Sequence, residues 1–496
     1  MRLNASVFYG LYRPSECDLR PYLQAKGVVE GKPSPYEEVI IALGRWHEER
    51  QLGKIGPFVD LRTGTEDDRI KRTIQAVKDG APALYQPLFR TDAQVGGQPV
   101  TLVGEPDFLI KDTDGYRITD AKIARRITEK DHPEILLQLG LYGWLFEQTF
   151  KIKPKRLEVL AGTGKLEEVP MHFIENARAH IEYIVQLLRS DAEPFSPVGW
   201  TKCSTCGFND RCWTTAVESK NVATVPGVDQ NLTRALRERG ISRIDELLRE
   251  FDESGLANFQ KPWGNKTQKV GKAAEKILRF ARALSSGKEE VLQTPPLPAA
   301  DNYVMFDLEG LPPQLDELDK IYLWGLQVFG AKPSKYLGKI ADIGPNGDRA
   351  GWDGFLEAAK SVFDSYGDVP FIHWTHYERT KVTAYVERYG DKNGVAERLK
   401  RSLVDLFPIT QNSIALPIPS YSLKVVEKYI GYKRSQTEYG GDWAMAAFIK
   451  ATETSDENKR RELLECILTY NREDLAATWA VFEWLRTKKA NNSFGE

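Results

Sequence analysis

Residues 100–123 read VTLVGEPDFLIKDTDGYRITDAKI, and this stretch predicts two neighbouring β-strands with acidic side chains at their ends. Side chains alternate between the faces of a strand, so Asp120 and Lys122 are expected on the same side. Asp107 precedes them, in GEPD on the neighbouring strand. Two carboxylates and one ammonium group should therefore converge. Phosphodiester hydrolysis uses such a set, because carboxylates hold Mg²⁺ or Mn²⁺ and a lysine orients the attacking water or offsets developing charge.

Two further features lie on either side of this stretch. His47, in LGRWHEER, is a candidate extra metal ligand. Gln138 and Tyr142 are four residues apart in HPEILLQLGLYGWLFEQTF, which places both on one face of the helix predicted there. Each feature alone is common in solvated strands, surfaces and cores, so the inference depends on their order along the chain.

The order His, Gly-x-x-Asp, Asp-x-Lys, Gln-x-x-x-Tyr resembles that of the PD-(D/E)xK nucleases of the RecB type, which include AddB and the CRISPR-adaptation exonucleases. The resemblance implies a restriction-endonuclease-like α/β core. It also implies that His47, Asp107 and Asp120 bind metal, that Lys122 serves the attacking water, and that Gln138 and Tyr142 lie near DNA and the catalytic centre.

The cysteines raise a separate question, because CSTCGFNDRCW at residues 203–213 contains three of the chain's five. Tetrahedral zinc and [4Fe-4S] clusters normally take four protein ligands, so Cys203, Cys206 and Cys212 need a partner. Cys466, in LLECILTY, is expected to be a small buried hydrophobic residue, which leaves Cys17 in RPSECDLRPYL as the better candidate.

One distant N-terminal cysteine followed by Cys-x2-Cys-x5-Cys resembles the iron-sulfur staple of AddB and the CRISPR-adaptation nucleases. The resemblance implies a [4Fe-4S] cluster on Cys17, Cys203, Cys206 and Cys212. These cysteines bracket the first site in the sequence, because all of its residues lie between Cys17 and Cys212. A zinc ion on the same four thiolates remains the alternative. In either case the expected role is to tie the two ends of the domain together, because metal-binding free energy becomes folding free energy.

A second acidic pattern lies in the C-terminal part of the chain. In NYVMFDLEG, Asp307 and Glu309 share one strand face, whereas Val304, Phe306 and Leu308 share the other. Tyr470 and Asp474 lie one helical turn apart in LTYNREDLAATWAVFEWL, where they could orient a water and hold a metal.

Asp-x-Glu on a first strand with Tyr-x-x-x-Asp on a late helix resembles the tyrosine variant of the DEDD 3′-5′ exonucleases, which have an RNase H-like fold. That family places an aspartate in a middle motif, usually Asn-x-x-x-Phe-Asp. Here FIHWTHYERTKV offers Glu378 as the metal-binding acid and His373 in the asparagine position, and Asp405 in LVDLFPI is a second candidate. Either the site tolerates Glu378 or it is a relic.

Four regions are expected along the chain of 496 residues: a nuclease domain with its four cysteines (1–216), a helical module (217–290), a Pro-rich linker (291–302) and an RNase H-like domain (303–496). The module should be almost wholly helical, and VPGVDQNLTRALRERGISRIDELL within it resembles a helix-hairpin-helix unit. A plain helical spacer is the alternative. The basic stretch QKPWGNKTQKVGKAAEK, which follows it, could bind phosphates.

Composition sets broader limits. The 68 basic and 70 acidic side chains nearly balance, so net charge does not identify a partner. The chain lacks a long apolar run and a signal-peptide pattern, and the expected compartment is the cytoplasm. The sequence favours a metal-dependent nuclease acting on DNA ends or single strands, with RNA as another possible substrate. Any ATP-driven unwinding would need a helicase or other repair or defence partner, because the sequence has no phosphate-binding loop motif. A binding or assembly subunit with vestigial nuclease folds is the rival hypothesis.

Overall fold

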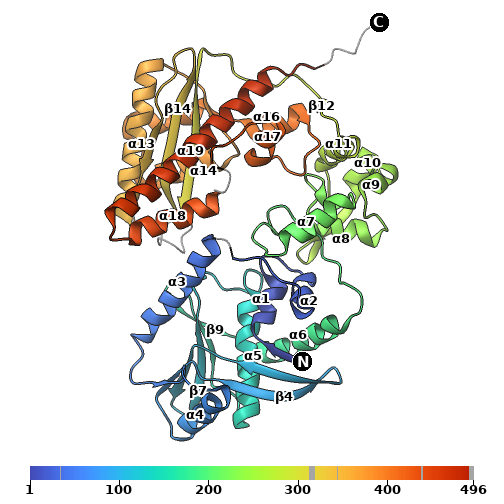
Figure 1. Ribbon diagram of the computed structural model, residues 1–496, viewed down its shortest axis with the longest axis vertical. Coiled ribbons are helices and arrows are strands. Elements are labelled where there is room, and N and C mark those ends of the chain that lie inside the picture. Colours follow the sequence, from blue (N-terminus) through green and yellow to red (C-terminus); the bar gives the residue numbers. More distant parts are fainter. Residues whose placement is uncertain (34, 312–318, 343, 437–439, 491–496) are drawn as a thin grey trace. The chain divides into compact units, whose positions relative to one another are not determined.

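The computed structural model describes residues 1–33, 35–311, 319–342, 344–436 and 440–490. The chain divides into two compact units (Figure 1). The first comprises Met1–Pro33, Glu37–Pro197 and Thr201–Asp210, and the second consists mainly of Arg211–Glu496.

The first unit is a mixed α/β structure. Its strands are β1 (Arg2–Asn4), β2 (Val59–Asp60), β3 (Ala83–Tyr85), β4 (Phe89–Val95), β5 (Gln98–Gly104), β6 (Phe108–Asp112), β7 (Gly115–Ala121), β8 (Leu157–Leu160) and β9 (Leu166–Val169). Its helices are α1 (Ser6–Tyr12), α2 (Leu19–Ala25), α3 (Pro35–Leu52), α4 (Glu66–Lys78), α5 (Pro133–Phe150) and α6 (Phe173–Arg189). A six-stranded sheet has the order β2-β3-β6-β7-β8-β9, and a three-stranded sheet has the order β1-β5-β4.

Helix α5 forms the centre of this unit's core. Its sequence is apolar around most of its circumference, and a helix of that kind must be covered on all sides. It packs against α1, α6 and strands of both sheets. Leu139, Leu141 and Leu145 of α5 are fully buried with Leu109 of β6 and Ile118 of β7. This packing fixes α5 beside the strands that carry Asp107 and Asp120.

The second unit begins with helices. These are α7 (Asn209–Glu218), a 3₁₀ turn (Val222–Thr224), α8 (Gln230–Glu238), α9 (Ile244–Glu250), α10 (Glu253–Asn258) and α11 (Ala273–Ser286). The expectation of an almost wholly helical module is wrong at one place, because β10 (Gln260–Trp263) and β11 (Lys266–Lys269) form an antiparallel hairpin. Gly264 has φ +56° at the first position of the two-residue turn, where such turns favour glycine.

A five-stranded sheet follows. Its strands are β13 (Asn302–Leu311), β14 (Lys320–Gly330), β15 (Leu337–Ile340), β16 (Phe371–His373) and β17 (Leu403–Asp405), in the order β15-β14-β13-β16-β17. The remaining elements are α13 (Pro345–Tyr366), α14 (Tyr377–Tyr389), a 3₁₀ turn (Lys392–Gly394), α15 (Val395–Ser402), α16 (Leu406–Ser413), β18 (Ile414–Ala415), α17 (Leu423–Tyr429), α18 (Gly441–Glu453) and α19 (Glu457–Arg486).

The sheet lies between two layers of helices, with α13 on one face and α19 on the other (Figure 1). Val304, Phe306 and Leu308 pack on the face covered by α13, in one hydrophobic cluster with its aromatic residues. Tyr303 and Met305 pack on the opposite face, in a cluster with α19. By the alternation of side chains, Asp307 and Glu309 belong to the α19 face.

The helical module and this sheet share a continuous core across the Pro-rich segment. Strand β12 (Glu290–Val291), at its start, pairs with β18, and the Phe280 ring of α11 lies 4.8 Å from the Tyr421 ring. Buried residues on both sides of residues 291–302 belong to one cluster. The Pro-rich segment therefore joins parts of one packed unit.

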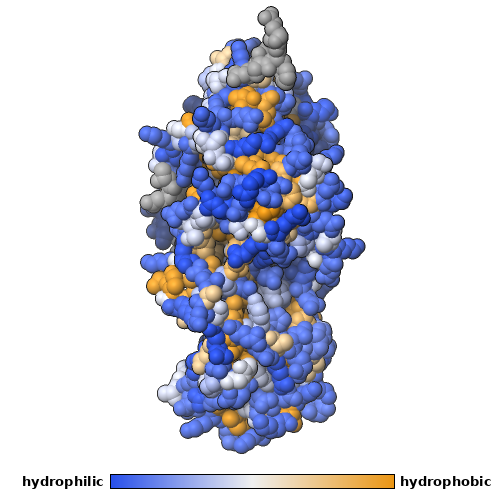
Figure 2. Space-filling view, turned by 90° about the vertical axis from the view of Figure 1, so that its right-hand side faces the viewer, coloured by the Kyte–Doolittle hydropathy of each residue, from blue (hydrophilic) through white to orange (hydrophobic). Residues whose placement is uncertain are grey.

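The face drawn in Figure 2 carries mostly hydrophilic side chains, with hydrophobic ones in small separate patches. Within the described ranges, none of the helices combines the length and the apolar character needed to span a bilayer.

Candidate functional site

Asp107 and Asp120 lie together where β6 begins and β7 ends. The two strands are antiparallel, with Phe108 opposite Thr119. The Asp107 backbone N–H donates to Asp120 Oδ1 at 3.0 Å, and the Ala121 N–H donates to Asp107 Oδ2 at 2.7 Å. Each carboxylate is therefore held by the backbone of the strand that carries the other.

Lys122 follows directly after β7 and completes this group. Its Nζ lies 2.5 Å from Asp120 Oδ2, and Asp120 is 1% exposed. In the described part of the chain, that buried oxygen makes no hydrogen bond of normal geometry. Burial and the Asp120 charge raise the pKa of Asp107 well above its usual range. Burial lowers the pKa of Lys122, but the charges of Asp120 and Asp107 outweigh it and raise the pKa overall. The group suits a hard divalent cation, which would relieve the repulsion between the carboxylates.

Gln138 and Tyr142 reach the same place from α5. Gln138 Nε2 donates to Tyr142 Oη at 2.7 Å. Burial and then the Asp120 charge raise the pKa of Tyr142 well above its ordinary value. A methyl group at Gly104, the glycine of GEPD, would lie 2.8 Å from Tyr142 Cδ1. A glycine there allows α5 to approach the strand so closely.

His47 projects from α3 toward the end of β8. Its Nε2 lies 3.3 Å from the Leu160 carbonyl oxygen, and its side chain is buried. The same carbonyl accepts a hydrogen bond of 3.0 Å from the Lys122 N–H. His47 thus lies beside Lys122, the residue that completes the carboxylate group, through the Leu160 carbonyl that both approach.

Glu48 is a further carboxylate of this site that the sequence patterns did not single out. Its charge acts on both Asp107 and Lys122, where it raises the pKa of each. Gln86 joins Glu48 to Asp107, because Gln86 Nε2 donates to Glu48 Oε1 and the Gln86 N–H donates to the Asp107 carbonyl, both at 2.8 Å. The only sequence signal was its position directly after His47.

The N-terminal segment that carries Cys17 contacts the segment that leads into the cysteine cluster. The Asp18 N–H donates to Ser196 Oγ at 3.0 Å, and the Gly31 N–H donates to the Gly207 carbonyl at 3.0 Å. These bonds join the two chain ends of the first unit within a few residues of Cys17 and Cys206.

The thiols themselves are half-buried, and none of the five forms a disulfide. Burial raises the pKa of Cys206, Arg20 lowers it, and the charge of Cys17 raises it, so Cys17 lies within electrostatic reach of Cys206. The Cys206 N–H donates to the Cys203 carbonyl at 2.9 Å. Cys212 lies on α7 and Cys466 on α19.

The second acidic set forms on the α19 face of β13. Asp307, Glu309 and Asp474 each offer an oxygen within 4.8 Å of the others. Among the residues that the structure describes, this is the one group of three such side chains that close together. Burial and neighbouring carboxylate charges raise the pKa of Asp307 and of Glu309 well above their usual range. Like the first set, it would be stabilised by a cation.

Polar side chains on α19 and on the segment between β14 and β15 orient this group. Asn471 Nδ2 donates to Asp307 Oδ2 at 2.7 Å, and Tyr336 Oη donates to Asn471 Oδ1 at 2.8 Å. Tyr470 is 4% exposed, and burial and the Asp474 charge raise its pKa well above the ordinary value. Asn471 directly follows Tyr470, which was its only sequence signal.

Two cations border the acidic set, and the sequence patterns predicted neither. The buried Arg434 guanidinium pairs with Asp474 Oδ1 and with Glu427, whose Oε1 lies 2.6 Å from Arg434 Nε. Lys424 Nζ lies 4.9 Å from the centre of the Tyr470 ring. These residues are 40 or more positions from Asp474, so no local spacing relates them to it.

Glu378 lies in the first turn of α14, outside the close group of three. Its charge nevertheless raises the pKa of both Asp307 and Glu309. Its Oε2 is 3.2 Å from His373 Nδ1. Asp405 has other partners, because its Oδ1 accepts hydrogen bonds from the Thr375 and Phe407 N–H groups. Glu378 is therefore better placed than Asp405 to act with the acidic set.

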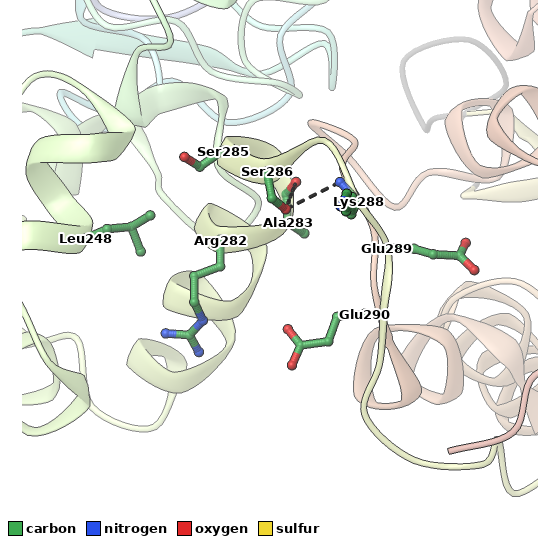
Figure 3. A pocket seen from close by; sticks show the side chains of 8 residues that line it. All are labelled: Leu248, Arg282, Ala283, Ser285, Ser286, Lys288, Glu289 and Glu290. Atoms are coloured by element: carbon green, nitrogen blue, oxygen red, sulfur yellow. Dashed lines mark hydrogen bonds between the residues drawn. The ribbon is translucent and has the colours of Figure 1, made fainter. Parts of the chain in front are cut away.

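A pocket of about 380 Å³ lies elsewhere in the second unit (Figure 3). It is lined by Leu248, Arg282, Ala283, Ser285, Ser286, Lys288, Glu289 and Glu290. None of the site residues described above lines it. Ser286 Oγ accepts the Lys288 N–H, and Glu289 accepts from Tyr429 Oη and pairs with Lys488. Its charged groups are thus partly engaged in holding the segment after α11.

Comparison with known proteins assigns each half separately. Residues 18–213 match the family model of the PD-(D/E)XK nuclease superfamily, and residues 304–486 match that of the RNase_H superfamily. The predicted mixed α/β class with these two folds is confirmed. No curated protein matches the chain significantly. A solved structure described as "Crystal structure of SSO0001" is 16% identical, covers 35% of this chain and 96% of that chain, and has a TM-score of 0.20, too low to support an argument.

Proposed function

Because the chain is a metal-dependent nuclease, a phosphodiester hydrolase with PD-(D/E)XK and RNase H superfamily domains, we propose that its first site degrades DNA from ends or as single strands. The observation that carries this proposal is the reciprocal bonding of Asp107 and Asp120 beside Lys122. It fixes two carboxylates and one ammonium group in a buried place, where Lys122 is the only partner of Asp120 Oδ2 among the described residues.

In this proposal Asp107 and Asp120 hold Mg²⁺ or Mn²⁺, with His47 as a further ligand and Glu48 adding a nearby carboxylate. The metal would polarise the phosphate and lower the pKa of a bound water. Lys122 positions the attacking water and offsets charge that develops on the phosphate. Tyr142, held by Gln138, borders the carboxylates and would lie near the bound DNA.

A second candidate activity, 3′-5′ exonuclease hydrolysis at the C-terminal site, is favoured by the close group of Asp307, Glu309 and Asp474. Tyr470 would orient the attacking water, and Glu378 would act as the outer carboxylate. The charge of Glu378 raises the pKa of Asp307 and of Glu309, which favours an active site over a relic.

Single and double variants of the full chain distinguish the activities of the two sites. Asp120→Ala should lower degradation of end-labelled DNA by at least about 100-fold with Mg²⁺ or Mn²⁺. Asp307→Ala should remove the remaining 3′-5′ trimming, and RNA in parallel reactions identifies the polymer. Asp114→Ala is the matched control, because that carboxylate is exposed on the turn of the same β6–β7 hairpin. Undiminished cleavage by Asp120→Ala would refute the first site.

We also propose that Cys17, Cys203, Cys206 and Cys212 hold a [4Fe-4S] cluster that ties the N-terminal segment to residues 203–212. We further propose that residues 217–290, which follow, form a helix-hairpin-helix-like module. The hydrogen bonds near Cys17 and Cys206 support a structural role. Freshly purified protein should be brown, bleach on reduction and contain about four iron atoms per chain. One zinc per colourless chain would assign the thiolates to zinc instead.

A further inference from the structure

The β10–β11 hairpin presents an exposed aromatic ring within a basic segment. Trp263 is 61% exposed at its tip. From Gln260 to Lys272 the chain has four lysines and no acidic residue. Lys266, Lys269 and Lys272 are all exposed. The segment therefore combines an accessible π-face with positive charge that no residue within it neutralises.

The register of the hairpin places the ring and one cation side by side. Trp263 pairs with Lys266 directly across the two-residue turn, so both side chains lie on one face of the hairpin. Cross-strand neighbours have Cβ atoms about 5 Å apart. A nucleotide offers the complementary pair of groups, a flat base and a charged phosphate.

The base of the hairpin is anchored, which leaves its tip as the accessible part. Lys261 pairs with Asp229, the residue that caps α8. The Gly271 N–H donates to the Ala257 carbonyl at 2.9 Å, and Lys269 Nζ donates to Asn258 Oδ1 at 2.9 Å. Lys269 lies on the face of the hairpin opposite Lys266, so it helps to hold the base while Lys266 accompanies Trp263 at the tip.

From this geometry we infer that the hairpin tip binds single-stranded nucleic acid, with one base stacked on Trp263 and the adjoining phosphate at Lys266. The inference rests on the proposed nuclease function, which supplies the polymer. A single strand is required because duplex bases already stack on one another and offer a hairpin only their phosphates. Base stacking tolerates any sequence, as a degrading enzyme requires.

The test measures binding without cleavage. The Asp120→Ala/Asp307→Ala chain in EDTA is titrated against fluorescein-labelled oligothymidylate, oligouridylate and a DNA duplex by anisotropy. Adding Trp263→Ala should weaken binding of single strands by about 5- to 100-fold, while the duplex changes little. Trp263→Phe should restore most of the affinity. Lys266→Gln should reduce the salt slope of single-strand binding by about 0.7. The relative affinities for the two oligonucleotides distinguish DNA from RNA.

Ile152→Ala is the control, because this side chain of the first unit is similarly exposed, at 56%. Unchanged single-strand affinity of Trp263→Ala, or an equal loss on the duplex, would overturn the inference. So would a loss confined to binding of anionic phospholipid vesicles, which would assign the tip to a membrane surface. If binding depends on Trp263 but the Asp120→Ala and Asp307→Ala substitutions leave cleavage unchanged, the proposed catalytic sites are refuted and this inference stands.

Discussion

The side chain of Asn471 lies directly over Gly325 of β14, where a methyl group would come within 1.7 Å of Asn471 Oδ1. Gly325 pairs with Asp307 across β13 and β14, and Asn471 donates to Asp307 Oδ2. A strand position without a side chain therefore lets the amide on α19 reach the carboxylate on the neighbouring strand. The geometry of the acidic set depends on this close approach.

Gly325→Ala should displace Asn471 and, through it, Asp307. A misplacement of about 1 Å at a reacting centre can cost roughly 100-fold in rate, so 3′-5′ exonuclease activity should fall by about that factor. Overpacking should also lower the free energy of unfolding by about 1–3 kcal/mol. Exonuclease assays of an Asp120→Ala background and chemical denaturation measure the two effects.

Gly354→Ala is the control for Gly325→Ala. Gly354 lies in α13, where an added methyl group would lie 3.8 Å from Lys339 Cδ, an ordinary contact. Alanine there should preserve activity and stabilise the helix slightly. Full exonuclease activity in Gly325→Ala would show that Asn471 does not position Asp307.

Patterns local in the sequence predicted the acidic elements. Strand alternation assigned Asp307 and Glu309 to the face opposite Val304, Phe306 and Leu308, and the packing of β13 agrees. The pairing of Tyr470 and Asp474 one turn apart also holds, because both lie on α19. Such features follow from residue spacing within one element, which the sequence displays directly.

Features that depend on tertiary proximity could not be predicted in this way. Arg434 and Lys424 reach the acidic set from segments outside β13 and α19. Glu48 and His47 are consecutive residues of α3, so the orientation of this helix about its axis decides which of the two side chains acts on Asp107. The hairpin at Trp263 was missed because its polar strands lack the apolar alternation that marks a half-buried strand.

Arg434→Met should destabilise the second unit when divalent metal is absent. Arg434, Glu427 and Asp474 form a buried ion network, with side chains 7%, 4% and 9% exposed. Removing one partner of a buried pair typically costs about 3–5 kcal/mol, because the other charge is left uncompensated. Unfolding measured in EDTA should show this loss. Mn²⁺ should then raise the melting temperature of the variant more than that of the wild type, because the metal offsets the carboxylate charge.

Arg486→Met is the matched control on α19. Arg486 pairs with Glu483 at 2.7 Å, but both side chains are about half exposed, at 51% and 44%. Exposed pairs contribute little, so its unfolding curve should follow that of the wild type with or without Mn²⁺. If Arg434→Met were equally stable in EDTA, Arg434 would not neutralise the acidic set.

His373 should make the second unit less stable as the pH falls. Burial lowers its pKa to about 4, against the opposing effects of the Asp405 charge and the Thr375 carbonyl. An unfolded imidazole has a pKa of about 6.5, so between these values the unfolded chain binds more protons and the free energy of unfolding decreases with falling pH. Glu378, which faces His373, acts in the opposite direction, because burial raises its pKa.

His373→Asn removes the imidazole and should flatten the decline between about pH 6.5 and pH 4. Denaturation of both proteins in EDTA across this range gives the two slopes. His376→Asn is the control, because His376 is exposed at the start of α14 and its replacement should leave the wild-type slope. The difference between the His373→Asn and wild-type curves isolates the imidazole, since Glu378 is present in both. If the two curves were parallel, His373 would take up a proton as readily in the folded protein as in the unfolded chain. The assignment of a buried neutral imidazole beside Glu378 would then be refuted.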